Sequence, residues 1–288
     1  MSGDTTSTRA PVARSQAPVH KRRKRLTRFI LPLFTWGMIF YLTLPILVMI
    51  VYSFNAVPNL DPIRQTPKFW GFTLQWWREP FAVPGLTDAL KNSLIIAPLS
   101  ASIATVLGTF LGLALGRYRF RGKAPVNFII FLAIAVPEIV LGSSLLSLFI
   151  TVDLFQIGFT TILIAHIAFS IPFVAVIIRA RVQGLDRSLE DAAQDLFASP
   201  ITAFFKVTLP LILPGIVSGF LLAFVLSLDD FVITNFVSGT IQTFPLWVYG
   251  ATRIGLPPQV NVMGTLLFAA GLLAAGVNVL VQHRRSKA

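Results

Sequence analysis

Long apolar stretches constrain this chain more than any other feature of its sequence. Six of them are long enough to cross the hydrocarbon core of a bilayer, which takes about 20 apolar residues in a helix. The 288 residues are 55% hydrophobic and only 12% charged, with a mean hydropathy of +0.75. A soluble domain of this length would need a more polar surface, so the sequence predicts an all-α membrane protein. The predicted spans are 29–54, 90–116, 125–150, 160–179, 209–231 and 260–281.

Lysine and arginine are distributed unequally between the two sides that these spans define. Eight of the 24 precede the first span, four lie in the loop 117–123, four in 179–206, and three follow His283. The other five are Arg64, Lys68, Arg78, Lys91 and Arg253. The positive-inside rule therefore predicts that both termini are cytoplasmic. The formal charge of +12 does not indicate nucleic-acid binding, because no base-reading motif accompanies it.

The first 28 residues form a polar arm that ends in a basic run at 21–28. Such a composition cannot bury enough apolar surface to fold, so we expect a disordered cytoplasmic arm and a membrane domain at 29–288. The apolar stretch after the arm is too long for a cleaved signal peptide. We expect the basic run to lie against anionic lipid headgroups. Since the chain has no cysteine, disulfides and Cys-ligated metals are excluded.

Small residues recur at every fourth position of the second span. They are Ala104, Gly108, Gly112 and Gly116. This spacing places them on one helix face, where another helix can approach closely, and it predicts a packing seam. Prolines interrupt several spans, and Pro137 predicts a break in the third.

The cytoplasmic loop between the fourth and fifth spans, about 182–208, carries helix-start signals. Ser188 is followed three residues later by Asp191, which predicts a capping box and a helix that begins there. Ala192 and Ala193 continue that helix with high propensity. Ser199, followed by a proline, predicts the cap and first turn of a second short helix. A short helix at the membrane surface is suited to docking another protein.

The stretch from Glu190 to Ile216 resembles the EAA loop of bacterial ABC importer permeases. The resemblance implies a six-transmembrane-helix ABC importer permease bundle in which this loop is the coupling helix for a cytoplasmic ATPase. The family usually has glycine where this chain has Phe197, so the turn is made differently or the ring is an added contact. The ATPase-coupling residues implied are Ser188, Glu190, Asp191, Ala192, Ala193, Asp195, Phe197 and Ser199.

Shorter matches extend the resemblance over most of the chain from Phe29 onward. The segments 92–94, 136–138, 227–239 and 255–261 are similar, in order and spacing, to spermidine/putrescine permeases of the PotC/PotI type. This resemblance implies polyamine import across the bacterial cytoplasmic membrane. It also implies a second homologous permease subunit, two copies of an ATPase and an extracytoplasmic substrate-binding protein. This chain would bind no cofactor, since ATP and Mg would be used by the ATPase. Another substrate, such as a sugar, iron or a phosphonate, remains an alternative.

Ionisable side chains inside apolar spans cost about 2.5–3.5 kcal/mol each at mid-helix, so they suggest function. Glu138, Asp229 and Asp230 could line the translocation pathway and attract a polycation, with cation–π contacts from nearby aromatics. In the alternative reading, the aspartates cap a helix or pair with Arg253, and Glu138 pairs with a buried donor. We expect His166 to be a hydrogen-bonded packing residue.

Other function classes fit the sequence less well. It contains neither an H-E-x-x-H pair nor a G-x-S-x-G elbow, and no metal site is expected. The stretch 116–124 departs from a phosphate-binding loop, because five residues separate its glycines and Ala124 replaces the Ser or Thr. A self-sufficient secondary transporter is disfavoured by the lack of a clear inverted repeat. A membrane scaffold would not need three intramembrane carboxylates.

Overall fold

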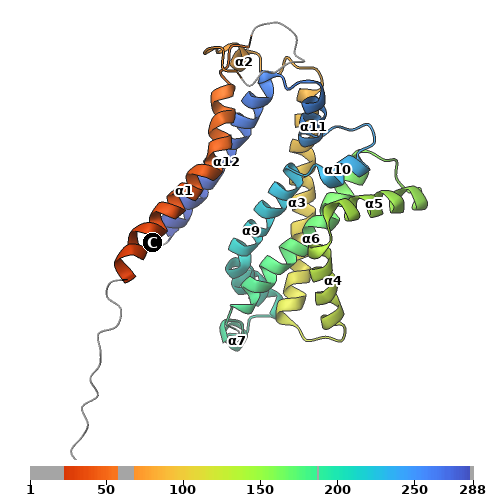
Figure 1. Ribbon diagram of the computed structural model, residues 1–288. Coiled ribbons are helices and arrows are strands. Elements are labelled where there is room, and N and C mark those ends of the chain that lie inside the picture. The colour runs from red at the N-terminus through yellow and green to blue at the C-terminus, as the bar shows by residue number, and fades with distance from the viewer. Residues whose placement is uncertain (1–22, 58–67, 187, 286–288) are drawn as a thin grey trace, which may run out of the picture. The chain divides into compact units, whose positions relative to one another are not determined.

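The computed structural model describes residues 23–57, 68–186 and 188–285 (Figure 1). Within these ranges the regular elements are helices, and one isolated β-bridge joins Asn55 and Phe72. The chain divides into two compact units. One comprises Met1–Ser53 with Gly264–Ala288, and the other comprises Phe54–Met263.

The first unit contains α1 (Arg23–Tyr52) and the larger part of α12 (Pro258–Arg285). A Cβ added at Gly264 would lie 2.6 Å from the Met49 sulfur, so the two helices pack closely there. Residues 1–22 of the predicted arm lie outside the described residues. Since α1 begins at Arg23, the last residues of that arm are helical.

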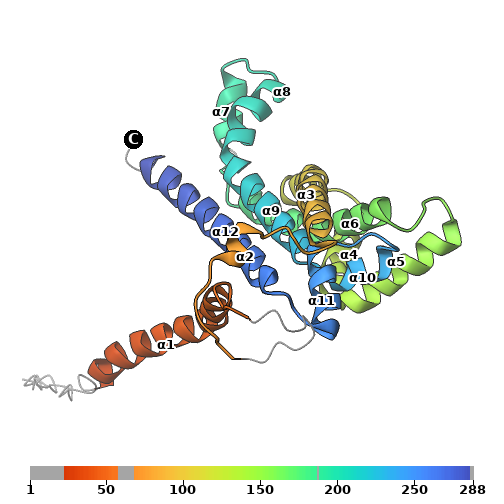
Figure 2. The ribbon, with the colours of Figure 1, turned by 90° about the horizontal axis from the view of Figure 1, so that it is seen from above.

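The second unit is built around α3 (Leu86–Arg117), α6 (Phe159–Gln183) and α9 (Leu209–Leu228), which lie side by side (Figures 1 and 2). The predicted glycine seam is confirmed, because a Cβ at Gly112 would lie 2.7 Å from that of Ile178. The facing pairs are Gly108 with Val174, Gly112 with Ile178 and Gly116 with Val182. Residue numbers rise together in these pairs, so α3 and α6 run parallel.

The helix α9 packs on the same part of α6 in the opposite direction. A Cβ at Gly219 would lie 3.1 Å from Val174, and one at Gly215 would lie 3.1 Å from Arg181. Numbers rise on one helix as they fall on the other, so α9 is antiparallel to α6. Val174 thus packs against glycines of both α3 and α9, which holds the three backbones close together.

The predicted third span is two helices, α4 (Lys123–Ala135) and α5 (Glu138–Val152), bent by 107°. The bend falls at Pro137, where a break was predicted, because proline removes a backbone donor and clashes with the preceding turn. The predicted break in the third span is therefore confirmed, and the span over 125–150 is a bent pair of helices. Since α3 and α6 run parallel, α4 and α5 together return the chain to the side from which α6 starts.

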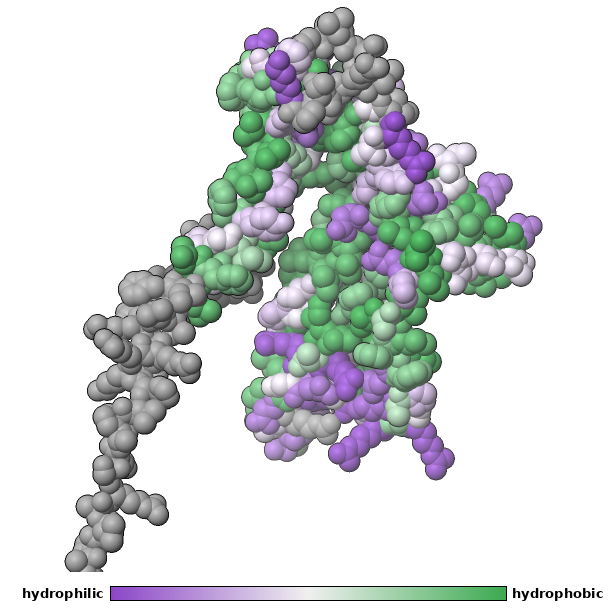
Figure 3. Space-filling view, in the orientation of Figure 1, coloured by the Kyte–Doolittle hydropathy of each residue, from purple (hydrophilic) through white to green (hydrophobic). Residues whose placement is uncertain are grey.

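Short helices occupy the ends of the long ones. The described residues include α2 (Gln75–Arg78), α7 (Ser188–Asp195), α8 (Pro200–Ala203), the π-helix η1 (Phe204–Thr208), α10 (Val232–Val237) and α11 (Phe244–Ile254). The π-turn precedes Pro210, which cannot donate a backbone hydrogen bond. Hydrophilic side chains gather at the end of this unit that carries α7, and hydrophobic ones cover the helices beside it (Figure 3).

Four of the described helices are long and apolar enough to cross a membrane, and the bent pair can make a fifth crossing. The four are Leu31–Tyr52, Leu86–Arg117, Phe159–Gln183 and Pro200–Leu228. The sixth predicted span coincides with α12, in which Pro258–Leu273 forms a shorter apolar helix. Helices therefore occupy all six predicted positions.

The glycine seam generates a stability prediction. We expect Gly112→Ala to lower the free energy of unfolding by about 1–3 kcal/mol, because its Cβ would lie 2.7 Å from the Ala175 carbonyl oxygen. Gly250→Ala is the matched control, since nothing lies within 4 Å of a Cβ there. Thermal unfolding of the detergent-solubilised chain compares the two variants. Equal melting temperatures would contradict the seam.

Candidate functional site

The helix α7 of the loop between α6 and α9 begins at Ser188, as predicted. Its cap differs from the predicted capping box, because Asp186 Oδ1 accepts a hydrogen bond from the Ser188 backbone N–H at 2.9 Å. This hydrogen bond, with a second from the Ser188 side chain, holds the pKa of Asp186 below its ordinary value. The carboxylate also lies at the end of α7 where the helix dipole favours negative charge.

The helix α7 ends in a Schellman motif with Phe197 at its left-handed position. Phe197 has a φ of 62°, its N–H donates to Gln194, and the N–H of Ala198 donates to Ala193. The chain thus keeps the backbone conformation that glycine ordinarily supplies, so the turn is not made differently. The left-handed conformation costs a residue with a Cβ about 1–2 kcal/mol. The Phe197 side chain is 99% exposed, so no contact within the described chain offsets that cost.

The second short helix also begins where predicted. The Ser199 hydroxyl accepts a hydrogen bond from the Thr202 backbone N–H at 3.2 Å, and Pro200 occupies the first turn of α8. From α8 the chain passes through η1 directly into α9. The loop is therefore continuous with a membrane-spanning helix.

Glu190 points toward the body of the unit. Its Oε2 forms an ion pair with Arg117 at the end of α3, and its Oε1 accepts a hydrogen bond from the Thr208 hydroxyl of η1. The side chains of Arg117 and Glu190 are 13% and 23% exposed. Ala193 is half-buried, whereas the other predicted coupling residues are exposed. These exposed residues are Ser188, Asp191, Ala192, Asp195, Phe197 and Ser199.

A cavity of about 540 Å³ lies between the C-terminal end of α3 and the loop. Its α3 wall includes Leu113 and Arg117, and its loop wall includes Glu190, Gln194 and Thr208. The cavity separates the two backbones, so long side chains make the connection between α3 and α7.

The second group of predicted site residues is a carboxylate cluster near the other end of α9. Asp230 is 7% exposed and accepts hydrogen bonds from Thr234, through N–H at 2.8 Å and Oγ1 at 2.7 Å. It also accepts the N–H of Ile233 at 3.3 Å. Asp230 therefore caps the start of α10, which is the structural alternative considered for it.

His166 completes this network, as its predicted packing role requires. The imidazole is 1% exposed, with Nδ1 at 2.7 Å from Ser227 Oγ and Nε2 at 3.2 Å from Asp230 Oδ2. Since the Thr234 hydroxyl gives its proton to Asp230, it can only accept from His166 Nε2, which lies 2.9 Å away, so Nε2 carries a proton. Ser100 Oγ donates to Ser227 Oγ, which extends the network from α10 through α6 and α9 to α3.

Glu138 and Asp229 are exposed in the single chain, unlike Asp230. Glu138 interacts electrostatically with both aspartates, so the structure brings the three predicted carboxylates together. Gly142, one turn beyond Glu138 on α5, allows this approach, because a Cβ there would lie 3.2 Å from Ile233 of α10. Glu138 and Asp229 are therefore the solvent-exposed members of the carboxylate cluster, and we call them its open members.

The proposed pairing of the aspartates with Arg253 is wrong. Arg253 donates to the Tyr249 hydroxyl at 2.6 Å, and its guanidinium lies 4.8 Å from the Tyr249 ring centroid. The Tyr249 ring in turn packs on Phe231 with centroids 4.3 Å apart. Phe231 follows Asp230 directly in the chain, so an aromatic pair borders the carboxylate cluster.

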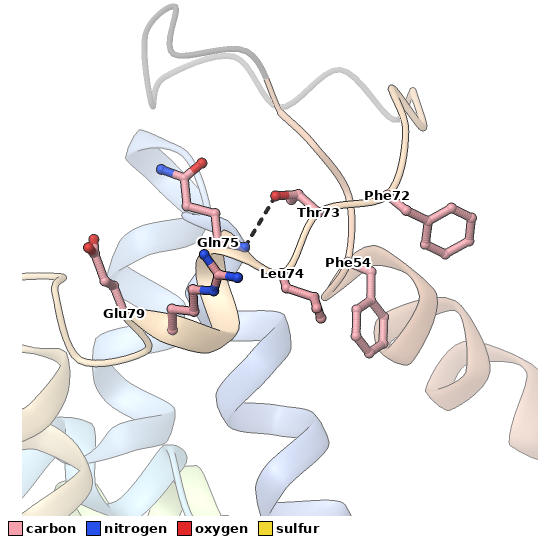
Figure 4. Close-up of a pocket in the computed structure, with 7 residues that line it drawn as sticks. Phe54, Phe72, Thr73, Leu74, Gln75 and Glu79 are labelled. Atoms are coloured by element: carbon pink, nitrogen blue, oxygen red, sulfur yellow. Dashed lines mark hydrogen bonds between the residues drawn. The ribbon is translucent and has the colours of Figure 1, made fainter.

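A larger pocket, of about 810 Å³, lies in the segment between α1 and α3 (Figure 4). Phe54, Phe72 and Leu74 form an apolar part of its lining, and Arg78 and Glu79 contribute opposite charges. Because its charges are balanced, this pocket does not have the acidic lining that would favour a polycation. Among the residues that the structure describes, no group of three or more acidic or histidine side chains could hold a metal ion.

No sequence pattern indicated the partners of Glu190 or His166. Arg117 lies in a basic loop, Thr208 in the stretch that resembles the EAA loop and Ser227 in the matched segment 227–239, but none of these patterns indicates a side-chain partner. Each comes from another helix, so no local spacing could indicate the contact.

Residues 108–285 match the family described as "Binding-protein-dependent transport system inner membrane component". The chain belongs to this family. The Haemophilus influenzae "Spermidine/putrescine transport system permease protein PotC" is 37% identical over 247 residues, which cover 85% of this permease and 93% of that protein. The Escherichia coli (strain K12) "Putrescine transport system permease protein PotI" is 39% identical over 238 residues, 80% of this chain and 82% of that one.

Solved structures of bacterial transporters share the fold of this permease. A chain of a bacterial ABC transporter for alginate import aligns with a TM-score of 0.63 and 16% identity, covering 93% of this chain and 99% of that chain. A MetNI methionine ABC transporter chain aligns with a TM-score of 0.58 and 18% identity, covering 67% and 94%. The protein is therefore a multi-pass inner-membrane permease component with the fold of ABC importer membrane subunits.

The different environments of the adjacent aspartates generate a second prediction. Asp230→Asn should lower the free energy of unfolding by about 1–3 kcal/mol, because an amide cannot accept all the hydrogen bonds of the buried carboxylate. Asp229→Asn is the matched control, because Asp229 is exposed and should tolerate the change. Thermal unfolding of the purified chains measures both. A stable Asp230→Asn variant would refute the capping role.

Proposed function

We propose that this permease forms half of the membrane pathway of an ATP-driven importer for polyamines such as spermidine and putrescine. The observation that carries the proposal is the pair of exposed carboxylates, Glu138 and Asp229. They lie beside a third, Asp230, whose hydrogen bonds are already made within the chain. Both relatives described above are named as permeases for spermidine, putrescine or both. A polyamine is a flexible polycation, which suits several separated carboxylates.

In this proposal, one carboxylate of the cluster stabilises the structure and the other two bind the substrate. Asp230 is held by Thr234 and His166, so its charge stabilises the start of α10. Asp229 and Glu138 remain exposed to bind ammonium groups, and the Phe231 ring beside them offers cation–π contacts of about 0.5–2 kcal/mol. Only two open carboxylates permit weak binding, which a translocation pathway requires for release.

The proposed assembly contains a second homologous permease, two copies of a cytoplasmic ATPase and an extracytoplasmic substrate-binding protein. The distribution of Lys and Arg supports cytoplasmic termini, which places α7 on the cytoplasmic side. There, Ser188, Asp191, Ala192, Asp195, Phe197 and Ser199 would contact the ATPase, while Ala193 and Glu190 hold the loop in place. ATP and Mg would be bound and used by the ATPase. Import would proceed by alternating access, in which closure of the ATPase dimer moves α7.

Uptake of labelled spermidine tests the proposed function together with its key residue. Cells lacking the chain should fail to take up spermidine, and the wild-type chain should restore uptake. Asp229→Asn should raise the KM about tenfold, equivalent to about 1.4 kcal/mol, because one attractive charge is lost. Copurification of the ATPase should remain unchanged in this variant.

Competitors and a second variant complete the uptake experiment. Excess putrescine should suppress the restored uptake, whereas a sugar should not. Glu138→Gln should resemble Asp229→Asn, because both side chains are open members of the cluster. Equal uptake with and without the chain would refute the polyamine assignment. Normal kinetics in both variants would refute the role of these carboxylates alone.

Phe197 generates a prediction that separates its ring from its backbone. Phe197→Ala removes the ring and keeps a Cβ in the left-handed conformation, whereas Phe197→Gly removes the ring and relieves the conformational cost. If the ring anchors the ATPase, both variants should weaken ATPase binding by about 2 kcal/mol or more. Binding of the purified ATPase to reconstituted permease measures this. Wild-type affinity in Phe197→Gly would show that only the backbone conformation matters.

A further inference from the structure

The carboxylate of Glu190 joins three elements that are separate in the chain. It belongs to the first turn of α7, its Oε2 pairs with Arg117 in the last turn of α3, and its Oε1 accepts from Thr208 in η1. Thr208 is 5% exposed and immediately precedes α9. One side chain thus fastens the short loop helix to the cytoplasmic ends of two long helices.

Helix-end electrostatics favour this arrangement. The N-terminal turn of α7 favours the negative charge of Glu190, and the C-terminal turn of α3 favours the positive charge of Arg117. Each charge is therefore stabilised by the dipole of its own helix, in addition to the attraction between the two charges. Partial burial of both side chains reduces screening by salt, so the attraction is stronger than that of an exposed surface pair.

The helices that Glu190 joins are themselves held together tightly. Backbone and side chains of α6 lie so close to Gly108 and Gly112 that even a methyl group would not fit without movement. Because α9 packs on the same α6 residue, Val174, the three helices cannot slide past one another easily. A force applied to α7 at Glu190 therefore acts on the whole group of helices.

From these contacts we infer that Glu190, Arg117 and Thr208 form a fixed joint that passes movement of α7 to α3 and α9. The inference rests on the proposed function, in which an ATPase moves α7. Glu190 is then a positioning residue that faces away from the ATPase, unlike its exposed neighbour Asp191. Arg117, Glu190 and Thr208 all line the cavity between α3 and the loop, so their side chains connect the two elements beside it.

Reconstituted complete importer in liposomes tests the joint by comparing spermidine uptake with ATP hydrolysis. Glu190→Gln and Arg117→Met should each lower the uptake per ATP hydrolysed by about tenfold, within the usual range of coupling between sites, while the ATPase stays bound. The double variant should be no worse than either single variant, because both remove one interaction. Asp191→Asn should instead release the ATPase.

A milder pair of variants covers the case in which the ion-pair variants fail to fold. Thr208→Val removes the hydroxyl donor to Glu190 and should lower uptake per ATP, whereas Thr208→Ser keeps the donor and should not. Release of the ATPase by Glu190→Gln, with Arg117→Met unaffected, would overturn the inference and make Glu190 an ATPase contact. Equal coupling in Thr208→Val and wild type would also overturn it.

A distance measurement tests the joint without any transported substrate. Since the chain has no cysteine, spin labels can be placed at Asp88→Cys on α3 and Gln194→Cys on α7 without background. If the joint is rigid, the distance between the labels stays the same with and without trapped ATP. In Glu190→Gln, the mean distance changes or the distribution of distances broadens. A change in the otherwise wild-type complex would refute the joint. Failure of wild-type spermidine uptake with an unchanged distance would refute only the polyamine function.

Discussion

Close packing of α6 against glycines of α3 and α9 is the constraint on which the second unit depends. In a bilayer, lipid tails are as apolar as leucine, so helices associate through close van der Waals packing rather than by escape from water. Val174 contacts Gly108 on one side and Gly219 on the other, which brings three backbones together around one residue. The direction of each helix follows from these pairs, and so does the need for α4 and α5 to return the chain.

Polar groups at the two ends of this packed group have different consequences. Toward one end, Asp230 pairs with His166 and accepts hydrogen bonds from the first turn of α10. The exposed Asp229 takes no part in these interactions and remains a separate charge. At the end that carries α7, Glu190 and Arg117 connect the loop to α3. In both places a costly charge is retained with a partner from another helix, as the low dielectric of the membrane and protein interior requires.

Family membership and fold establish the kind of protein, while the chemistry of single residues suggests how it works. The solved ABC transporter chains are under 20% identical to this permease, yet they share its fold. Phe197 shows how the sequence can vary within such a fold. The Schellman turn is kept by backbone hydrogen bonds, so a bulky residue can occupy the left-handed position and present its ring outward.

The sequence alone determined the membrane class, the positions of the helices, the glycine seam and the start of α7 at Ser188. These features depend on apolar length, four-residue spacing and local capping, which are all properties of neighbouring residues. Only the tertiary structure decided the 107° bend, the inward direction of Glu190 and the partners of His166, one of which is 68 residues away. Those outcomes depend on which helices meet, and local sequence does not encode a partner on a distant helix.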